Sequence, residues 1–318
     1  MKNFVLGNFH TLLGSIAFPQ KPILGSVSVR IPLLDQEFTT LIINAPLTKP
    51  SREKVVVLFH GLGGCAQSHY LVRLVPKLLE LGYTVVRFNH LGAWPEDCAL
   101  VKSLYHCGRY LDLWCALQYV AQRWPGAEKF AVGYSLSANM LLYLLGRASG
   151  FEKKVLEQYT RYFAVCPPVD LLKSIQHLGS PKSFLYDRYF ARILVKKFLD
   201  WNSNGKLNVS HKEVSQIKSV YEFDDLITSQ FCRASGALEY YHRYSSGRVV
   251  SNIVFDTTLI AALDDPIVDS TGLLSCEFPK NVELRLLDHG GHVGFMDLNS
   301  VKTLGKNHAL DNQILSRF

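Results

Sequence analysis

Short hydrophobic segments alternate with amphipathic segments from about residue 54 to residue 166. Segments rich in β-branched and aromatic residues predict buried strands at 54–59, 83–88, 130–132 and 162–166. Between them, hydrophobic residues recur every three or four positions, which predicts helices at 70–81, 110–124 and 136–145. Buried strands that alternate with amphipathic helices are typical of a mostly parallel central sheet with helices on both faces.

The pattern changes after Pro167 and Pro168. Residues 170–246 are mostly helical in pattern and rich in Tyr, Phe, Lys and Arg, whereas strand character returns at 257–262 and 282–287. The last dozen residues predict a final helix. We therefore expect one α/β domain over residues 1–318, with a helical cap inserted at 169–248.

The composition permits a large core, because 48% of the 318 residues are hydrophobic and 19% are charged. The net charge is +7, but Lys and Arg are scattered and no nucleic-acid motif is present, so we expect no nucleic-acid partner. Arg188, Arg192 and Lys196 follow one another at steps of four in a predicted helix. We interpret this stripe as a solvated face, with contact to an acidic lipid as the alternative.

The seven cysteines are an odd number and include no C-x-x-C pair. We expect reduced thiols rather than disulfides or zinc ligands. No stretch of about 18 apolar residues is present, so we expect no integral membrane association. The first residues lack a convincing signal-peptide cleavage site. The predicted location is cytoplasmic, and the oligomeric state stays open.

The first candidate for chemistry is Ser135, which lies in Gly133-Tyr134-Ser135-Leu136-Ser137 between a predicted strand and a predicted helix. A serine hydroxyl becomes a nucleophile when it is exposed and a base removes its proton. A sharp strand-to-helix turn exposes the hydroxyl, and small residues on both sides let strand and helix pass closely. Because a Gly-x-Ser turn is also an ordinary helix N-cap, this motif is weak by itself.

A second motif, His60-Gly61-Leu62-Gly63-Gly64, follows the first predicted strand. Acyl transfer needs two backbone N–H groups that face the developing oxyanion. We expect these donors to be Leu62 in this loop and Leu136 after the serine. The alternative is a flexible glycine loop with a structural histidine.

The third signal is a pair of motifs that end the last two predicted strands. Asp264-Asp265-Pro266 follows the first, and His289-Gly290-Gly291-His292 follows the second. The chain order Ser, Asp, His with each residue at a strand end matches the α/β-hydrolase fold. We prefer Asp265 over Asp264 as the acid because it stands directly before the proline. We prefer His292 over His289 as the base because two glycines give its loop room to reach over the sheet.

The chain resembles the YheT-like branch of the α/β-hydrolase superfamily, relatives of the eukaryotic α/β-hydrolase-domain lipases and esterases. The resemblance covers nearly the whole chain. Its matching stretches are 8–11, 59–62, 133–136 with Asn139-Met140, 222–228, 264–266 and the rather specific segment 289–295. It implies that Ser135, Asp265 and His292 form a catalytic triad, and that the activity is hydrolysis of carboxylic esters through an acyl-enzyme.

Two segments depart from the family pattern. Ser137-Ala138 replaces a pair of glycines, which tightens the turn at the serine, and residues 89–93 stand where relatives carry an arginine-glycine loop. We interpret 222–228 as structural, with Asp224 or Asp225 capping a helix of the cap.

The expected substrate is a small-molecule ester, with lipid-like esters among the candidates. A thioesterase or an acyltransferase would carry the same triad, and a non-catalytic binding protein on this scaffold is the alternative outside enzymes. The histidines are dispersed and no carboxylate cluster appears, so we expect no metal and no cofactor.

Overall fold

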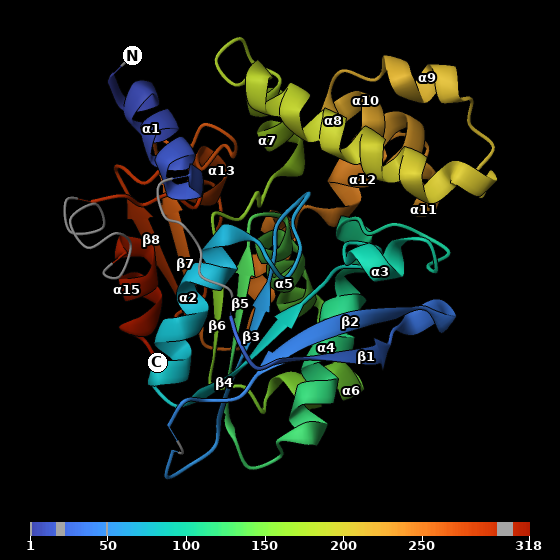
Figure 1. The fold of residues 1–318 in the computed structure, drawn as a ribbon. Helices are drawn as coiled ribbons and strands as arrows, with labels where there is room; N and C mark the ends of the chain where they lie inside the picture. Colours follow the sequence, from blue (N-terminus) through green and yellow to red (C-terminus); the bar gives the residue numbers. More distant parts are fainter. Residues whose placement is uncertain (1, 17–22, 49, 298–307) are drawn as a thin grey trace.

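The computed structural model describes residues 2–16, 23–48, 50–297 and 308–318 (Figure 1). Its centre is an eight-stranded sheet in the order β1-β2-β4-β3-β5-β6-β7-β8. The pairs β1·β2 and β2·β4 are antiparallel, and every pair from β4 to β8 is parallel. The strands are β1 (Ser26–Pro32), β2 (Phe38–Asn44), β3 (Lys54–Phe59), β4 (Tyr83–Phe88), β5 (Glu128–Tyr134), β6 (Arg161–Val165), β7 (Thr257–Ala262) and β8 (Val282–Leu287).

Helices lie on both faces of the sheet and above the carboxyl ends of its parallel strands (Figure 1). They are α1 (Lys2–Ile16), α2 (His69–Glu80), α3 (Pro95–Cys98), α4 (Tyr110–Arg123), α5 (Leu136–Arg147), α6 (Gly150–Leu156), α7 (Leu171–Leu178), α8 (Phe184–Trp201), α9 (His211–Gln216), α10 (Val220–Phe223), α11 (Ser229–Phe231), α12 (Ala237–Tyr244), α13 (Thr271–Leu274) and α15 (Ala309–Leu315).

The inner strands β3 to β7 bury both of their faces, and this explains their continuous hydrophobic segments. In β3, Val55 and Val57 face the cluster that contains the buried side chains of α4 and α5. Val56 and Leu58 face the opposite cluster, to which α2 and α15 contribute. Because successive side chains of a strand point to opposite faces, a strand between two helical layers has no position for a solvated side chain.

All six strands that the sequence predicts are confirmed, but the prediction missed β1 and β2. These two strands form the antiparallel edge of the sheet, and five of the seven residues of β1 are exposed. The largely solvated edge strand β1 lacks the continuous hydrophobic segment of the central strands. β2 is mostly buried, but Thr39 and Thr40 limit its hydrophobic segment to residues 41–43. The prediction therefore began at β3.

Between β6 and β7 the chain forms α7 to α12, which lie above the carboxyl ends of the parallel strands (Figure 1). The long helix α8 buries Ala191, Phe198 and Trp201, which contribute to the packing of this helical layer. None of the helices in the described residues combines the length and the apolarity that a membrane span requires.

The C-terminal helix α15 is fixed to α2 by a buried ion cluster. The Asp311 carboxylate lies 3.0 Å from Arg73 Nη2 and 2.5 Å from Lys77 Nζ, and its side chain is fully buried. Burial alone would raise the pKa of Asp311, but the charges of Arg73 and Lys77 more than offset it, so the pKa is lowered. The helix therefore depends on an ionised Asp311.

Asp311→Asn should lower the free energy of unfolding at pH 7 by about 3–5 kcal/mol, because it leaves two cations without their buried counter-charge. The folded-state pKa of Asp311 lies below the ordinary value of 3.8, so its contribution is present above pH 3.8 and is lost as the pH falls below it. Urea denaturation followed by circular dichroism measures both effects. Asp200→Asn, at an exposed ion pair with Lys196, is the control and should change stability by about 0.5 kcal/mol or less.

Candidate active site

Ser135 lies on the sharp turn between β5 and α5. Its backbone has φ = 53° and ψ = −119°, a strained conformation for a residue with a side chain. The turn is tight because β5 and α5 nearly touch: a Cβ atom on Gly133 would lie 2.8 Å from the carbonyl oxygen of Ser137. The sequence therefore places glycine where the close approach requires it, and the turn lifts the Ser135 side chain above the strand ends.

The structure brings Ser135, His292 and Asp265 into one hydrogen-bonded line. His292 Nε2 lies 2.9 Å from Ser135 Oγ, and His292 Nδ1 lies 2.8 Å from Asp265 Oδ2. The other oxygen of Asp265 accepts the backbone N–H groups of Ile267 and Val268, at 2.8 and 2.9 Å. These two bonds fix the direction of the carboxylate, and the carboxylate in turn fixes the imidazole.

The neighbouring Asp264 supports the histidine loop instead of the imidazole. Its Oδ1 accepts the backbone N–H groups of Gly290 and Gly291, both at 2.8 Å, and its Oδ2 lies 3.3 Å from His289 Nδ1. Because consecutive residues at a strand end point in different directions, the two aspartates bind two different parts of the same loop. His289 is 44% exposed and is not bonded to Ser135.

Helix α1 packs against the loop that carries His292 and binds its backbone, a contact that the sequence did not predict. The backbone N–H of His292 donates to Thr11 Oγ1 at 2.9 Å, and the Thr11 hydroxyl donates to the carbonyl of Gly7 at 2.8 Å. A Cβ on Gly7 would lie 1.8 Å from the carbonyl oxygen of Asp264, so α1 is in direct backbone contact with the loop after β7. The match of residues 8–11 to the family was the signal that could have indicated this role.

The two expected oxyanion donors, Leu62 and Leu136, line one pocket together with Ser135. Leu136 is the first residue of α5, so its N–H has no partner inside the helix. Among the described residues, no acceptor takes a hydrogen bond from the backbone N–H of Leu62. Both groups are therefore available to an oxygen atom bound beside Ser135.

Two tyrosines that the sequence analysis did not single out hold the loop that contains Leu62. The hydroxyl of Tyr70 accepts the N–H of Gly61, and the hydroxyl of Tyr105 accepts the N–H of Gly63, each at 2.7 Å. The N–H groups on both sides of Leu62 are thus occupied, while its own is not. These two hydrogen bonds fix the loop backbone on both sides of Leu62.

Ser137 belongs to a buried network below the turn. Its hydroxyl donates to the carbonyl of His60 and lies 2.6 Å from His90 Nε2. The backbone N–H of His90 donates to His60 Nε2 at 3.1 Å. Burial lowers the pKa of His90 to about 3 and that of His60 well below 6.5, so both rings are neutral. Ser137 and His90, which lie in the two segments that we expect to depart from the family pattern, therefore contact each other.

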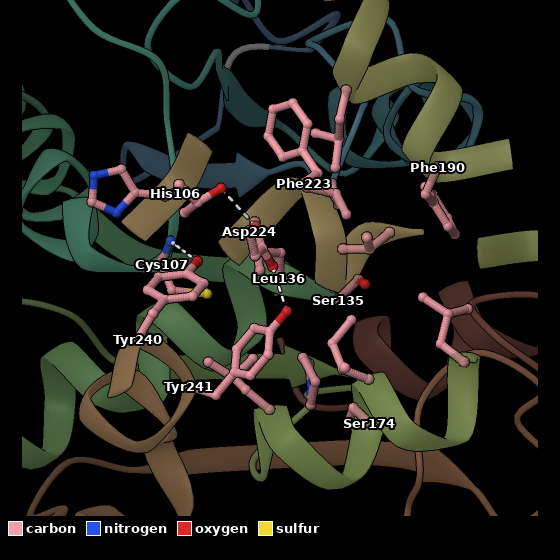
Figure 2. A pocket seen from close by; sticks show the side chains of 18 of the residues that line it. His106, Cys107, Ser135, Leu136, Ser174, Phe190, Phe223, Asp224, Tyr240 and Tyr241 are labelled. Atoms are coloured by element: carbon pink, nitrogen blue, oxygen red, sulfur yellow. Dashed lines mark hydrogen bonds between the residues drawn. The ribbon is translucent and has the colours of Figure 1, made fainter. Parts of the chain in front are cut away.

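An apolar pocket of about 100 Å³ opens at Ser135 (Figure 2). Its side chains come from the oxyanion loop, from the loop after β7 and from the helices above the sheet, and they include Leu62, Leu171, Ile175, Leu178, Phe190 and Ile267. In the view of Figure 2, Ser135 lies between the side chains of His106 and Tyr240 on the left and that of Phe190 on the right. The site thus combines a reactive hydroxyl with a mainly apolar enclosure.

Asp224 and Asp225 have different roles in a π-helical turn, Asp224–Thr228. Asp225 Oδ1 accepts the N–H of Ala237 at the start of α12, which agrees with the predicted capping role. Asp224 instead accepts hydroxyl hydrogen bonds from Thr228 and Tyr241, at 2.6 and 2.8 Å, and lines the pocket. Burial raises its pKa to about 6.

Among the described residues, one group of side chains has metal-ligand atoms close together: Cys166, Asp265 and His292, whose atoms lie within 4.8 Å of one another. Asp265 and His292 are already hydrogen-bonded to each other. Burial raises the pKa of the Cys166 thiol well above its usual range, which disfavours the thiolate that metals bind. The geometry suits the Asp–His pair better than a metal centre.

The sheet order, the strained serine turn and the loop that holds His292 define the chain as an α/β-hydrolase. Solved structures share this fold. The esterase Pf2001 of Pyrococcus furiosus matches 96% of this chain over 92% of its own, with a TM-score of 0.57 and 15% identity. Est1E of Butyrivibrio proteoclasticus matches 90% of this chain over 99% of its own, with a TM-score of 0.52 and 12% identity. At such identities the likeness concerns the fold alone.

Sequence comparison identifies the family. YheT of Escherichia coli, which carries the name of an esterase, is 30% identical over 272 residues, or 84% of this chain and 78% of its own length. The chain belongs to the YheT-like family of α/β-hydrolases, which are carboxylic ester hydrolases. No protein-family model matches the chain.

Two eukaryotic relatives match less of their own length. The monoacylglycerol lipase ABHD2 of Danio rerio is 24% identical over 84% of this chain and 64% of the relative. The phospholipase ABHD3 of Bos taurus is 26% identical over 78% of this chain and 59% of the relative. The chain thus aligns with less than two thirds of either protein.

The buried His90 should make stability depend on pH. Its imidazole has a pKa of about 3 when folded and an ordinary pKa of 6.5, so unfolding takes up a proton between these values. The stabilisation is complete above pH 6.5 and is lost as the pH falls toward 3. We expect the wild type to lose up to about 1.4 kcal/mol per pH unit more than His90→Gln across this window. Urea denaturation of both proteins at several pH values tests this. If the free energy of unfolding changes with pH equally in the wild type and in His90→Gln, the pKa of His90 is not lowered in the folded protein.

Proposed function

We propose that the chain cleaves small, apolar carboxylic esters by covalent catalysis, with Ser135 as nucleophile, His292 as base and Asp265 as the acid that orients it. The observation that carries this proposal is the continuous line from Asp265 Oδ2 through His292 to Ser135 Oγ, with contacts of 2.8 and 2.9 Å, which ends in an apolar pocket. A merely structural serine would not need a strained backbone, a histidine contact and an open pocket at once.

In the first half of the reaction, Ser135 Oγ attacks the ester carbonyl carbon and its proton passes to His292 Nε2. The carbonyl oxygen becomes an oxyanion, which the N–H groups of Leu62 and Leu136 stabilise. The C–O bond to the alcohol then breaks, and His292 returns the proton to the departing oxygen. In the second half, water repeats these steps on the acyl-enzyme and releases the acid.

The orienting acid has two effects on the base. Asp265 keeps the proton of the neutral imidazole on Nδ1, so that Nε2 can accept the serine proton. Its negative charge also stabilises the imidazolium that forms in the transition state. Because the backbone N–H groups of Ile267 and Val268 already hold the second carboxylate oxygen, little reorganisation is needed.

The pocket indicates the class of substrate. A preformed apolar cavity of about 100 Å³ is smaller than one of about 150 Å³ that holds benzene, so it accommodates an acyl group of a few carbons. The names of the relatives, a lipase and a phospholipase, favour lipid-like esters. All seven cysteines are free, which fits a reducing compartment, and we propose a cytoplasmic location on that ground.

A fluorophosphonate probe should modify Ser135 alone, because this serine combines an activating base with two oxyanion donors. Mass spectrometry of the labelled protein locates the adduct. Ser135→Ala should abolish labelling, whereas Ser137→Ala serves as the control for a neighbouring buried serine and should keep it. An adduct on another serine, or none on folded wild-type protein, would favour a non-catalytic binding protein.

The adjacent aspartates should differ in their effect on hydrolysis of short p-nitrophenyl esters. Asp265→Asn should lower kcat by about 10²–10⁴, since the amide no longer holds the imidazole in the reactive tautomer. Asp264→Asn should cost about tenfold or less, because an amide oxygen can still accept the N–H groups of Gly290 and Gly291. Thermal melts of both variants exclude unfolding as the cause. Equal small losses would mean that another group orients His292.

A further inference from the structure

Exposed hydrophobic side chains concentrate on two helices above the pocket. Seven of the nineteen large hydrophobic side chains that are exposed among the described residues lie on α1 and on the first two turns of α8. On α1, Val5 and Phe9 are 67% and 52% exposed and are one helical turn apart. On α8, Leu185 and Tyr189 are 68% and 59% exposed at the same spacing. Such a concentration on a soluble surface marks an interaction site.

The two helices are joined directly, so these side chains form one surface. The hydroxyl of Tyr186 on α8 donates to Asn8 Oδ1 on α1 at 2.7 Å. Figure 1 places α1 and the start of α8 on the same side of the molecule, beyond the carboxyl ends of the parallel strands. The hydrophobic side chains of both helices therefore lie near the outer rim of the site.

Along the outward face of α8, the exposed apolar side chains of its first turns are followed by basic side chains. Arg188, Arg192 and Lys196 are three, seven and eleven residues after Leu185, so a helix of 3.6 residues per turn places all of them on one face. Together with Lys218 they line a groove of about 490 Å³. Lys196 is paired with Asp200, but in the described part of the chain no carboxylate forms an ion pair with Arg188, Arg192 or Lys218.

We propose that this α1–α8 surface, formed by the exposed apolar residues of α1 and α8 and by the basic groove, docks the protein on an anionic lipid membrane. Apolar side chains beside Lys and Arg are the pattern of interfacial helices, which insert the former at the acyl boundary and place the latter at the headgroups. The inner face of α8 contributes Phe190 and Leu194 to the pocket, so one helix connects the membrane to the site. That link rests on the proposed function, whereas docking itself does not.

A lipid membrane accounts for both the basic groove and the exposed hydrophobic side chains beside it. Each Lys or Arg near an anionic lipid surface strengthens binding about fivefold, and the attraction weakens as salt rises. The groove alone could take a free phosphate. The hydrophobic side chains beside it have no role in binding a small anion. A lipid bilayer offers acyl chains to these side chains and anionic headgroups to the groove.

The test is co-flotation of the full chain with vesicles of phosphatidylcholine alone or with about 25% phosphatidylglycerol. We expect flotation with the anionic vesicles at about 0.1 M salt, weaker flotation at about 0.5 M, and little with neutral vesicles. Excess inorganic phosphate should not displace the protein. No flotation with anionic vesicles, or complete displacement by phosphate at constant ionic strength, would overturn the proposal.

Paired variants distinguish binding through the α1–α8 surface from nonspecific hydrophobic binding. Phe9→Ser with Leu185→Ser should weaken vesicle binding at least tenfold. Leu47→Ser with Leu81→Ser removes two side chains of similar exposure, 69% and 53%, from the segments that lead into the amino ends of β3 and β4, and should leave binding unchanged.

A second pair tests the charges. Arg188→Gln with Arg192→Gln should weaken binding to anionic vesicles about 25-fold, and Arg52→Gln with Lys154→Gln, which removes the same charge elsewhere, should change it less than twofold. Equal losses in test and control pairs would overturn a defined surface. None of these variants should change hydrolysis of a soluble short ester. Ser135→Ala should float like the wild type, so a failure of catalysis and a failure of docking are distinguishable.

Discussion

The pair of carboxylates at the end of β7 is the interaction on which the candidate site depends. Asp264 holds the backbone of the histidine loop, and Asp265 holds the imidazole that the loop carries. Because Asp264 and Asp265 both follow the end of β7, this one strand positions the histidine loop and the imidazole ring together. The bond from His292 to Ser135 then joins residues 157 positions apart, and it forms because parallel strands deliver both loops to the same edge.

A second layer of neutral polar groups supports the serine turn. Ser137, His60 and His90 share hydrogen bonds in a fully buried space, and neither ring carries a charge that burial would penalise. The network connects the first turn of α5 to the segments that directly follow β3 and β4. The buried Ser137 hydroxyl is tolerated here because the His60 carbonyl and the His90 ring satisfy it.

The helices above the sheet give the site its environment. α8 has two faces: Phe190 and Leu194 enclose the pocket, and the opposite face presents apolar and basic side chains to solvent. α1 lies against the loops after β7 and β8 and extends the same outer surface. The candidate reactive groups therefore lie at the strand ends, and the helices above them enclose the pocket. The helix α8 belongs both to the pocket and to the outer surface.

The sequence by itself determined the six strands β3 to β8, the order Ser135, Asp265, His292 and the loop with Leu62. Local hydrophobic periodicity and turn residues encode these features. It did not reveal the edge strands β1 and β2, the tyrosines that hold the oxyanion loop, the contact of Ser137 with His90 or the role of Thr11. The direction in which each of Asp264 and Asp265 points was likewise set by tertiary structure. Such features depend on which distant side chains fill the same space, and that is decided only when the sheet and its covering helices assemble.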